Sequence, residues 1–348
     1  MPSSKKPIKI KPSEVASDTK KRLIPEVSKR HHDRFPPYSY LYAQPLIDVL
    51  LEKRETWESD LPSFTVMAGD PVNNAIGWAQ SLGEQVPFIC AANEKRPGGD
   101  WETGVVGYEE RLCRRSNLSA TLSSPHPESY AQMNYPIPIE GAVYSPNVVL
   151  FREHQDTIES LPVAEWIGFP VISIPPTRWP KLTDGGKRYS FAEERQLMQN
   201  KMRAALLICA YQKFKHVVIG DFGLGNGYRN PPRELAEMWR EVLLWDPDLR
   251  SRFKGIAFVF EDEKQSTSKH IQEDIAKKSK SAGSSSKSRS KSISSSSSTS
   301  SHSSSGLSSS HRSDFKIFRD VFDQNEVARI RQQADPRYGF ATIMAGGG

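Results

Sequence analysis

The sequence predicts a three-layer α/β/α sandwich, in which helices cover both faces of a central mixed sheet. Short apolar runs alternate with helical stretches, and two of these runs lead directly into glycine-containing turns. With 348 residues, the chain is long enough for one large domain or two small ones. Its first residues contain no apolar core of a secretory signal, and no run approaches the ~18 apolar residues of a membrane span. We therefore expect a soluble intracellular protein without a membrane partner.

The individual elements follow from local signals taken in chain order. We expect the first strand at residues 64–67, after which Asp70 supplies an N-cap and Pro71 the first turn of a helix that ends near Leu82. The other strands are expected at residues 87–92, 142–144, 148–151, 171–174, 216–220 and 255–260, and the long helices at residues 191–214 and 232–244. Apolar residues at helical spacing predict one last helix over residues 314–333 that packs back on the body.

The net charge of +6 is concentrated in two segments. Residues 1–34 hold ten Lys/Arg against four Asp/Glu, and residues 277–312 hold seven against none, so the rest of the chain is acidic. We expect residues 1–34 to be a flexible basic arm and residues 35–348 to be the folded domain. The arm is either a solvated spacer or a segment that directs the protein to the nucleus or to polyanions. The folded body itself does not have the charge of a nucleic-acid platform.

Residues 279–313 form a low-complexity segment. Serine accounts for 22 of its 35 residues, and Ile293 and Leu307 are its only large apolar side chains. Such a segment cannot bury enough apolar surface to offset the entropy of ordering it. We expect a disordered insertion between two ordered elements, which acts as a spacer or as a phosphorylation or nuclear-targeting tract.

Cysteine and histidine usage argues against metal and redox chemistry. The three cysteines, Cys90, Cys113 and Cys209, are far apart and form no Cys-x-x-Cys pair. The histidines lack partners at the spacing of a metal site. We therefore expect no disulfide framework, no metal ion and no cofactor.

The first candidate motif follows the strand expected at residues 87–92. The chain there runs into Asn93 and then into the turn Pro97-Gly98-Gly99-Asp100. In an open α/β sheet, ligands bind beyond the carboxyl ends of the strands, and a glycine pair lets backbone N–H groups approach a ligand closely. Taken alone, the segment is more typical of an ordinary turn at the end of a strand.

The second motif is Gly107-Tyr108-Glu109-Glu110, at the expected start of a helix. Adjacent carboxylates there interact favourably with the helix dipole, and such a pair is usually only a solvated helix start. The alternative is that one glutamate acts as a general acid while its neighbour orients a sugar hydroxyl, as glycoside hydrolysis requires.

The third motif lies between the strand expected at residues 216–220 and the helix that begins with Pro231 and Pro232. It reads Gly223-Leu224-Gly225-Asn226-Gly227-Tyr228. Glycines between a strand and a helix N-terminus provide unhindered backbone donors at the positive end of a helix dipole, which suits a phosphate group. The spacing is neither that of a Rossmann fingerprint nor that of a Walker loop. We favour ligand binding over a purely structural turn.

Together, the three motifs resemble those of the microbial-type poly(ADP-ribose) glycohydrolase family, whose fold is the macrodomain. Ala91-Ala92-Asn93 is similar to the macrodomain strand ending. Pro97-Gly98-Gly99-Asp100 followed by Tyr108-Glu109-Glu110 is similar to the family's glycine triplet and Gln-Glu-Glu. The late glycine loop resembles the family's pyrophosphate loop, and Tyr144-Ser145-Pro146-Asn147 resembles a segment between them. The resemblance covers roughly residues 41–260 and the final helix.

The resemblance implies a macrodomain that hydrolyses the glycosidic bond at the distal ribose of ADP-ribose or poly(ADP-ribose), carried by protein or nucleic acid. Glu110 would be the catalytic acid/base, Glu109 would hold ribose hydroxyls, and Asn93 would contact the same ribose. The other substrate-binding residues would be Pro97, Gly98, Gly99, Asp100 and Tyr108 and, around the diphosphate, Gly223, Leu224, Gly225, Asn226, Gly227 and Tyr228. We expect the protein to be a monomer.

Two departures from the family pattern fall in the loop that shapes the reaction site: Asp100 replaces the third glycine, and Tyr108 replaces the glutamine. The glycine loop also has Asn226-Gly227 where the family has an apolar and an aromatic residue, and Tyr228 is the residue that could supply the stacking surface. A macrodomain that binds ADP-ribose without turnover stays open as the alternative, since a fold does not establish catalysis. A nucleotide-binding oxidoreductase fits poorly, because the chain lacks an early Gly-x-Gly-x-x-Gly unit.

Overall fold

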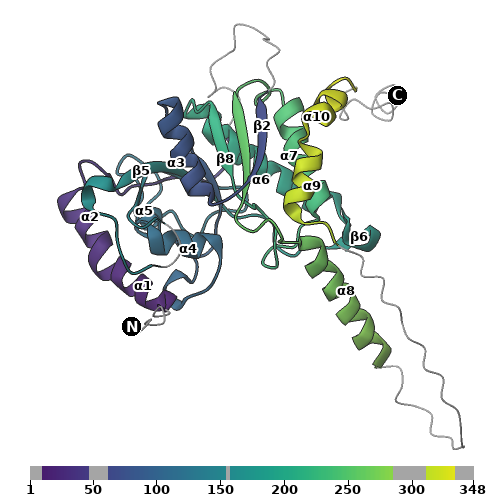
Figure 1. Ribbon diagram of the computed structural model, residues 1–348, viewed down its shortest axis with the longest axis horizontal. Coiled ribbons are helices and arrows are strands. Elements are labelled where there is room, and N and C mark those ends of the chain that lie inside the picture. The colour runs from purple at the N-terminus through teal and green to yellow at the C-terminus, as the bar shows by residue number, and fades with distance from the viewer. Residues whose placement is uncertain (1–9, 47–61, 154–156, 285–310, 334–348) are drawn as a thin grey trace, which may run out of the picture.

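The central sheet has seven strands in the order β1-β4-β5-β3-β8-β9-β2. The computed structural model describes residues 10–46, 62–153, 157–284 and 311–333, and Figure 1 shows their arrangement. The strands are β1 (Tyr40–Tyr42), β2 (Ser63–Ala68), β3 (Phe88–Ala91), β4 (Ala142–Leu150), β5 (Ile167–Ile174), β8 (His216–Ile219) and β9 (Gly255–Phe260). All neighbouring strands from β5 to β2 are parallel, whereas β4 is antiparallel to both of its neighbours. The sheet is therefore mixed, as the sequence predicts.

Helices cover both faces of the sheet (Figure 1). One apolar cluster contains α3 (Pro71–Leu82), α4 (Tyr108–Arg115) and α5 (Leu118–Ser123). The other contains α6 (Ala192–Tyr211), α7 (Pro232–Trp245), α9 (Asp314–Val321) and α10 (Gln324–Arg331). Alternate side chains of β3 show the division, because Phe88 and Cys90 join the first cluster and Ile89 joins the second. The predicted three-layer sandwich is confirmed.

Two further elements lie outside these layers. The strands β6 (Leu182–Thr183) and β7 (Arg188–Tyr189) form a small separate sheet. The helix α8 (Thr267–Ser284) projects away from the body of the molecule (Figure 1). None of the helices in the described ranges has the length and apolar character that a membrane crossing requires.

The predicted strands and helices are present, with two differences in how they are divided. The runs expected as separate strands at residues 142–144 and 148–151 form the single strand β4, whose register against β5 shifts between Ser145 and Val148. The expected last helix is divided into α9 and α10. Asp323 begins the second of these by accepting hydrogen bonds from the backbone amides of Asn325 and Glu326.

The expectation of a flexible arm over residues 1–34 is wrong for the part that the structure describes. Residues 1–9 lie outside the described residues, but α1 (Pro12–Asp18), a π-helical stretch (Thr19–Leu23) and α2 (Ile24–Arg30) follow one another without a break. Four apolar residues of this segment are buried: Val15, Ala16, Leu23 and Val27. Their spacing gives the segment an apolar side, which its many basic residues obscured at the sequence level.

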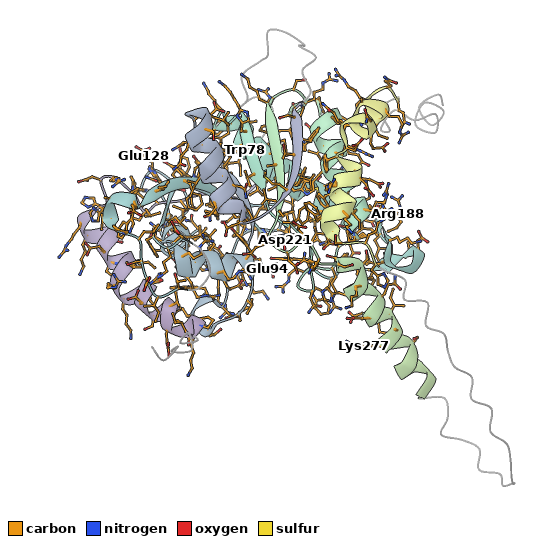
Figure 2. All side chains as sticks on the ribbon, viewed as in Figure 1. Trp78, Glu94, Glu128, Arg188, Asp221 and Lys277 are labelled. Atoms are coloured by element: carbon orange, nitrogen blue, oxygen red, sulfur yellow. The ribbon has the colours of Figure 1, made fainter. Side chains whose placement is uncertain are left out.

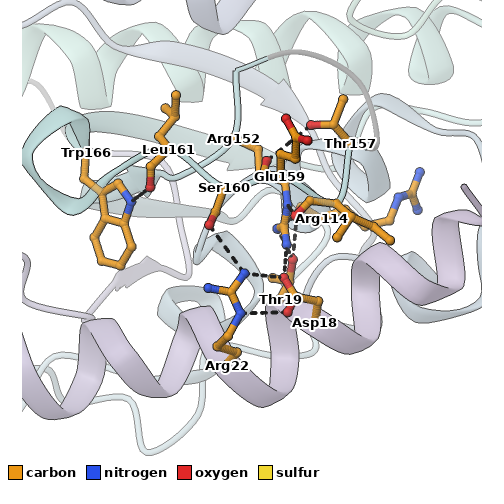
Figure 3. A network of polar contacts seen from close by, with 11 residues as sticks. Asp18, Thr19, Arg22, Arg114, Arg152, Thr157, Glu159, Ser160, Leu161 and Trp166 are labelled. Carbon is orange, nitrogen blue, oxygen red and sulfur yellow. Dashed lines mark hydrogen bonds and ion pairs between the residues drawn. The ribbon is translucent and has the colours of Figure 1, made fainter. Parts of the chain in front are cut away.

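A buried arginine connects this helical segment to the rest of the domain (Figure 3). Arg152 donates hydrogen bonds to the hydroxyl of Thr19 at 2.5 Å and to the carbonyl of Arg114 at 2.9 Å, and it forms an ion pair with Asp18. Thr19 in turn donates to the carbonyl of Arg114 at 2.7 Å. Because a buried guanidinium needs acceptors for its N–H groups, the segment is part of the fold, and the folded domain begins before residue 35.

The serine-rich segment is shorter than expected at both of its described ends. Residues 279–284 continue α8, and residues 285–310 lie outside the described part of the chain. Ser313 caps α9 by accepting a hydrogen bond from the amide of Lys316. The next residue, Asp314, is buried and accepts from both the amide and the hydroxyl of Thr267. The chain therefore leaves the domain at the start of α8 and returns at the start of α9, where Thr267 is bonded to Asp314.

Replacing Thr19 with valine should lower the free energy of unfolding by about 1 to 3 kcal/mol, because buried Arg152 loses one acceptor and the carbonyl of Arg114 loses one donor. Chemical denaturation followed by circular dichroism measures the change. The matched control is Lys20→Ala, since Lys20 is exposed and forms a surface ion pair with Glu102, so its loss should cost less than about 1 kcal/mol. Equal effects of the two substitutions would contradict the role of the Arg152 contacts.

Candidate active site

Two loops singled out in the sequence lie at one edge of the sheet. They follow the neighbouring parallel strands β3 and β8. Figure 2 labels Glu94, which comes after β3, and Asp221, which comes after β8. The helix α4 packs against β3. The carboxyl ends of two central strands and the start of a helix thus converge where an open α/β sheet normally binds its ligand.

Asn93 shapes the loop after β3. Its side-chain Oδ1 accepts hydrogen bonds from the amides of Lys95 at 2.8 Å and Arg96 at 3.0 Å, which closes a tight turn. Pro97 then leads into Gly98 and Gly99, whose φ angles of +75° and +58° are in the left-handed region that favours glycine.

Asp100, which the resemblance places among the substrate-binding residues, is engaged within its own loop. Its carboxylate forms an ion pair with Arg96 at 2.7 Å, and both side chains are exposed. A glycine could not form this contact. The departure from the family's glycine triplet therefore adds a surface ion pair to the loop.

Glu109 is a deeply buried carboxyl group, with 4% of its surface exposed. It lies in the first turn of α4, and its Oε2 accepts a 2.7 Å hydrogen bond from the backbone amide of Asn93. Its other carboxyl oxygen, Oε1, is buried and has no hydrogen-bond partner among the described residues. One oxygen of Glu109 is thus committed to the fold, and the other is left for a ligand.

Glu110 is half-buried and packs against two glycines. A Cβ atom on Gly99 would lie 2.6 Å from Glu110 Oε1 and 3.4 Å from Asn93 Nδ2, and a Cβ atom on Gly107 would overlap Glu110 Oε2. A side chain at either glycine would therefore displace the carboxylate. The two glycines leave the space for Glu110, and its carboxylate and the side-chain amide of Asn93 both lie near Gly99.

The pKa of Glu109 is raised to about 8. Burial is the largest cause, the charge of Glu110 adds to it, and the backbone amides of Asn93 and Gly98 oppose it. Glu109 therefore carries a proton through most of the neutral range and can donate a hydrogen bond as well as accept one. Burial thus contributes more to the raised pKa of Glu109 than the neighbouring carboxylate does.

Tyr108 is anchored at the base of α3. Its hydroxyl donates to Asp70 Oδ1 at 3.3 Å and accepts from the amide of Val72 at 3.4 Å, and its ring packs edge-to-face on Phe88. Asp70 also forms a buried ion pair with Arg115 at 2.5 Å. These contacts indicate that Tyr108 positions the first turn of α4, which differs from the substrate contact expected from the sequence.

The glycine loop after β8 is tied into the fold. Gly223 and Gly225 both have a φ angle of +76°, and the amide of Gly225 donates a 2.6 Å hydrogen bond to the buried hydroxyl of Thr267. The amide of Leu224 donates to the carbonyl of Asp221 at 3.0 Å. The N–H of Gly225 is thus used within the protein, contrary to the expectation that it would be offered to a diphosphate.

The far end of the glycine loop faces outward. Asn226 and Gly227 are exposed, and a Cβ atom on Gly227 would meet nothing within 4 Å. The next residue, Tyr228, is half-buried, and burial together with the charge of Glu109 raises the pKa of its hydroxyl. Because β3 and β8 are neighbouring parallel strands, the glycine loop and the loop that contacts Glu109 lie at the same end of the sheet.

Asn230, to which the sequence gave no role of its own, holds the loop in shape. It is fully buried, and its Nδ2 donates to the carbonyls of Gly223 and Thr177, both at 2.8 Å. Its Oδ1 accepts from the hydroxyl of Tyr189, also at 2.8 Å. The signal that could have found it is its position directly before the two prolines that begin α7.

Tyr135 is a second residue that sequence reasoning missed. Its hydroxyl is buried and has no hydrogen-bond partner among the described residues. Burial is the largest cause of its raised pKa, and the charge of Glu109 adds to it. The amide of Ile137 donates to the carbonyl of Glu94 at 2.8 Å and holds this segment against the loop after β3. No motif marks residue 135, so only the folded chain reveals it.

The site offers two carboxyl groups, an amide and two tyrosine hydroxyls as its chemical groups. Within the ranges that the structure describes, no group of three or more His, Cys, Asp or Glu side chains is arranged to hold a metal ion.

The raised pKa of Glu109 predicts a specific dependence of stability on pH. Its pKa rises from 4.5 to about 8 on folding, so the folded protein holds this proton at pH values where the unfolded chain has released it. The free energy of unfolding should therefore fall as the pH rises from about 5 to about 8. Thermal unfolding of the wild type and of Glu109→Gln across this range should show a smaller fall in the variant, which cannot ionise at this position. Parallel curves for the two proteins would show that Glu109 is not the cause.

Comparison with known proteins shows a partial match to a family model and a shared fold. Residues 26–153 match the family model described as Microbial-type PARG, catalytic domain, whereas none of the curated protein sequences matches the chain. The poly(ADP-ribose) glycohydrolase of Thermomonospora curvata is similar in structure, with a TM-score of 0.56 and 18% identity over 76% of this chain and 98% of that chain. The poly(ADP-ribose) glycohydrolase of Deinococcus radiodurans in complex with ADP-ribose has a TM-score of 0.51 and 19% identity over 71% of this chain and 98% of that chain.

The two kinds of match carry different information. At this level of identity the solved structures show that the fold is shared. The family model covers Asn93, the turn at Gly98 and Gly99, and both glutamates, while the glycine loop after β8 lies beyond it. Over residues 26–153, which hold the glutamate pair, this chain is similar to the microbial-type poly(ADP-ribose) glycohydrolase family.

Proposed function

We propose that this protein is a glycosidic-bond hydrolase that cleaves at the distal ribose of poly- or mono-ADP-ribose attached to a macromolecule and releases ADP-ribose. The observation that carries the proposal is the glutamate pair at the start of α4, in which a buried Glu109 and a half-buried Glu110 both adjoin Asn93. The relatives support the substrate class. The Deinococcus radiodurans structure contains ADP-ribose, and a second Thermomonospora curvata structure, with a TM-score of 0.54, contains the inhibitor ADP-HPD.

Glu110 is the catalytic acid/base in this proposal. Hydrolysis of a ribosyl bond passes through an oxocarbenium-like state, which requires a proton on the leaving oxygen and then an activated water. Of the two carboxyl groups, that of Glu110 is the more accessible, because Gly99 and Gly107 leave room around it. One group can serve both steps, since giving its proton to the leaving oxygen converts it into the base that water needs.

Glu109 holds a hydroxyl of the distal ribose. The amide of Asn93 keeps its Oε2 in place, and the unpartnered Oε1 is free to bond a sugar hydroxyl. Because Glu109 is protonated near neutral pH, it can act towards the sugar as donor or acceptor. A buried oxygen without a partner costs about 1 to 3 kcal/mol, and substrate binding would remove that cost.

The remaining residues bind the substrate around this pair. Asn93 Nδ2, beside Glu110, suits a ribose hydroxyl, and Tyr228 supplies an aromatic side chain from the glycine loop. The other proposed binding positions are Pro97, Gly98, Gly99, Asp100, Gly223, Leu224, Asn226 and Gly227. Gly225 contributes through the shape of its loop, since its amide is held by Thr267.

Glu110→Gln tests the catalytic role directly. The amide keeps the size and hydrogen-bonding reach of the side chain but cannot transfer a proton, so release of ADP-ribose should slow by about a hundred- to ten-thousand-fold. Binding of ADP-ribose, measured by calorimetry, should be retained. Glu102→Gln is the matched control, because Glu102 is an exposed glutamate outside the pair, and it should keep the wild-type rate.

The outcomes separate the enzyme from its alternative. A wild-type protein that binds ADP-ribose but releases it from neither the polymer, nor a mono-ADP-ribosylated protein, nor ADP-ribosylated nucleic acid is a reader without turnover. Full activity of Glu110→Gln would instead show that the acid/base has been assigned to the wrong group.

Tyr135→Phe removes the buried hydroxyl and keeps the ring. Because this hydroxyl has no partner among the described residues, its loss should not lower the free energy of unfolding. If the hydroxyl contacts substrate, kcat/KM should fall by about tenfold. Steady-state kinetics and chemical denaturation measure the two effects, and Tyr130→Phe, at a fully exposed tyrosine, is the matched control. Loss of stability with unchanged kinetics would make Tyr135 a structural residue.

Several finer expectations stay predictions of this proposal. They are the macromolecule that carries the ADP-ribose, the nuclear or nucleocytoplasmic location with a role in the DNA damage response, and the monomeric state. The tethering role of the basic N-terminal residues loses some support, because Lys20 pairs with Glu102 and Arg22 pairs with Asp18 on the folded domain.

A further inference from the structure

Trp179 is an exposed aromatic residue that the proposed reaction does not use. It follows β5, and 57% of its surface is exposed, whereas Trp101, Trp166 and Trp239 are buried. Its φ angle of +56° is in the left-handed region, which a bulky residue adopts only when the surrounding structure imposes it. An indole that is held in a strained conformation and yet left exposed is placed for contact with another molecule.

Trp179 is held against the glycine loop. Its backbone amide donates to the carbonyl of Tyr228 at 2.7 Å, and its indole Nε1 donates to the carbonyl of Gly227 at 2.8 Å. The guanidinium of Arg229, the next residue of the loop, lies 4.3 Å from the centre of the indole, and Arg229 also has a positive φ angle of +59°. The ring is therefore preorganised beside the loop that lies next to the glutamate pair.

Trp179 lines a hollow of about 490 Å³ next to α8. Phe191 and Ile275 add exposed apolar surface to this hollow. Arg229 forms an ion pair with Asp274, the one acidic side chain of the lining, and Lys181 and Lys278 add positive charge. The Nζ of Lys181 lies 5.3 Å from the centre of the Phe191 ring. Both exposed aromatic rings therefore adjoin a cation, and the volume is in the range of small-molecule sites.

We infer that this hollow binds a second nucleotide unit of poly(ADP-ribose), beside the unit at the glutamate pair. Aromatic side chains next to cations bind nucleotides by stacking on the base and attracting the phosphates. The inference rests on the proposed function, and the shared residues support it, because Arg229 belongs both to the glycine loop and to the wall of the hollow. A chain of linked units bound at the glutamate pair could reach this wall across residues 227–229. The protein should then bind the polymer more tightly than a single ADP-ribose.

Equilibrium binding to the Glu110→Gln protein tests the inference, with ADP-ribose and a short poly(ADP-ribose) chain of defined length as the two probes. Trp179→Ala should weaken binding of the polymer about tenfold and leave the affinity for ADP-ribose within about twofold. Lys181→Glu, a change at an exposed side chain, should also weaken polymer binding, and more strongly at low salt. Tyr130→Ala, at an exposed aromatic residue outside the hollow, is the control and should change neither affinity. Thermal unfolding midpoints confirm that each variant is folded.

Unchanged polymer affinity in both variants would overturn the inference. An equal loss of affinity for both probes would also overturn it, because Trp179 would then act only through the shape of the glycine loop. A parent protein that binds neither probe would overturn the proposed function itself, so the two failures can be told apart.

Discussion

The hydrogen bond from the backbone amide of Asn93 to Glu109 Oε2 is the contact on which the site depends. It joins the end of β3 to the first turn of α4, across 16 residues of chain. Because it engages Oε2, the oxygen of Glu109 without a hydrogen-bond partner among the described residues is Oε1. The first turn is fixed from its other side by Tyr108, which bonds to Asp70, and Asp70 is in turn neutralised by Arg115. The orientation of both glutamates follows from this double attachment of α4.

One step along a helix gives two neighbouring glutamates different surroundings. Successive side chains on an α-helix point about 100° apart, so Glu109 turns into the body while Glu110 lies over the glycines of the adjoining loop. Burial makes one carboxyl group reluctant to ionise, and the neighbouring position remains accessible. Environments that separate two carboxyl groups in this way are how acid and base roles are divided at known sugar-cleaving sites. The different surroundings of the two glutamates need no additional residue, because they follow from the start of α4 at Tyr108.

The fold and the location of the site could be predicted because their signals are local. Asp70 caps α3 as its position before a proline suggests, and the apolar runs that end at Asn93 and Gly220 are strands of the sheet. The missed features depend on residues far apart in the chain. The hydroxyl of Thr267 accepts a hydrogen bond from the amide of Gly225, which is 42 residues away in the chain. Arg152 donates a hydrogen bond to Thr19, which is 133 residues away. No motif or spacing rule predicts partners at such separations, so the helical N-terminal segment was mistaken for a flexible one.

The contact between Thr267 and Asp314 makes the serine-rich stretch a natural point of variation. The hydroxyl of Thr267 accepts a hydrogen bond from the amide of Gly225 and donates one to the carboxylate of Asp314. The hydroxyl of the neighbouring Ser266 donates a hydrogen bond to the carbonyl of Arg312 at 3.0 Å. The chain therefore leaves and rejoins the domain at a single junction whose two sides are bonded to each other. Residues inserted or removed after the end of α8 and before residue 311 would leave the junction, and the loop that it supports, in place. Evolution could lengthen, shorten or recompose this stretch, and a protein engineer could graft a reporter there, while the edge of the sheet that holds the candidate site stays unaltered.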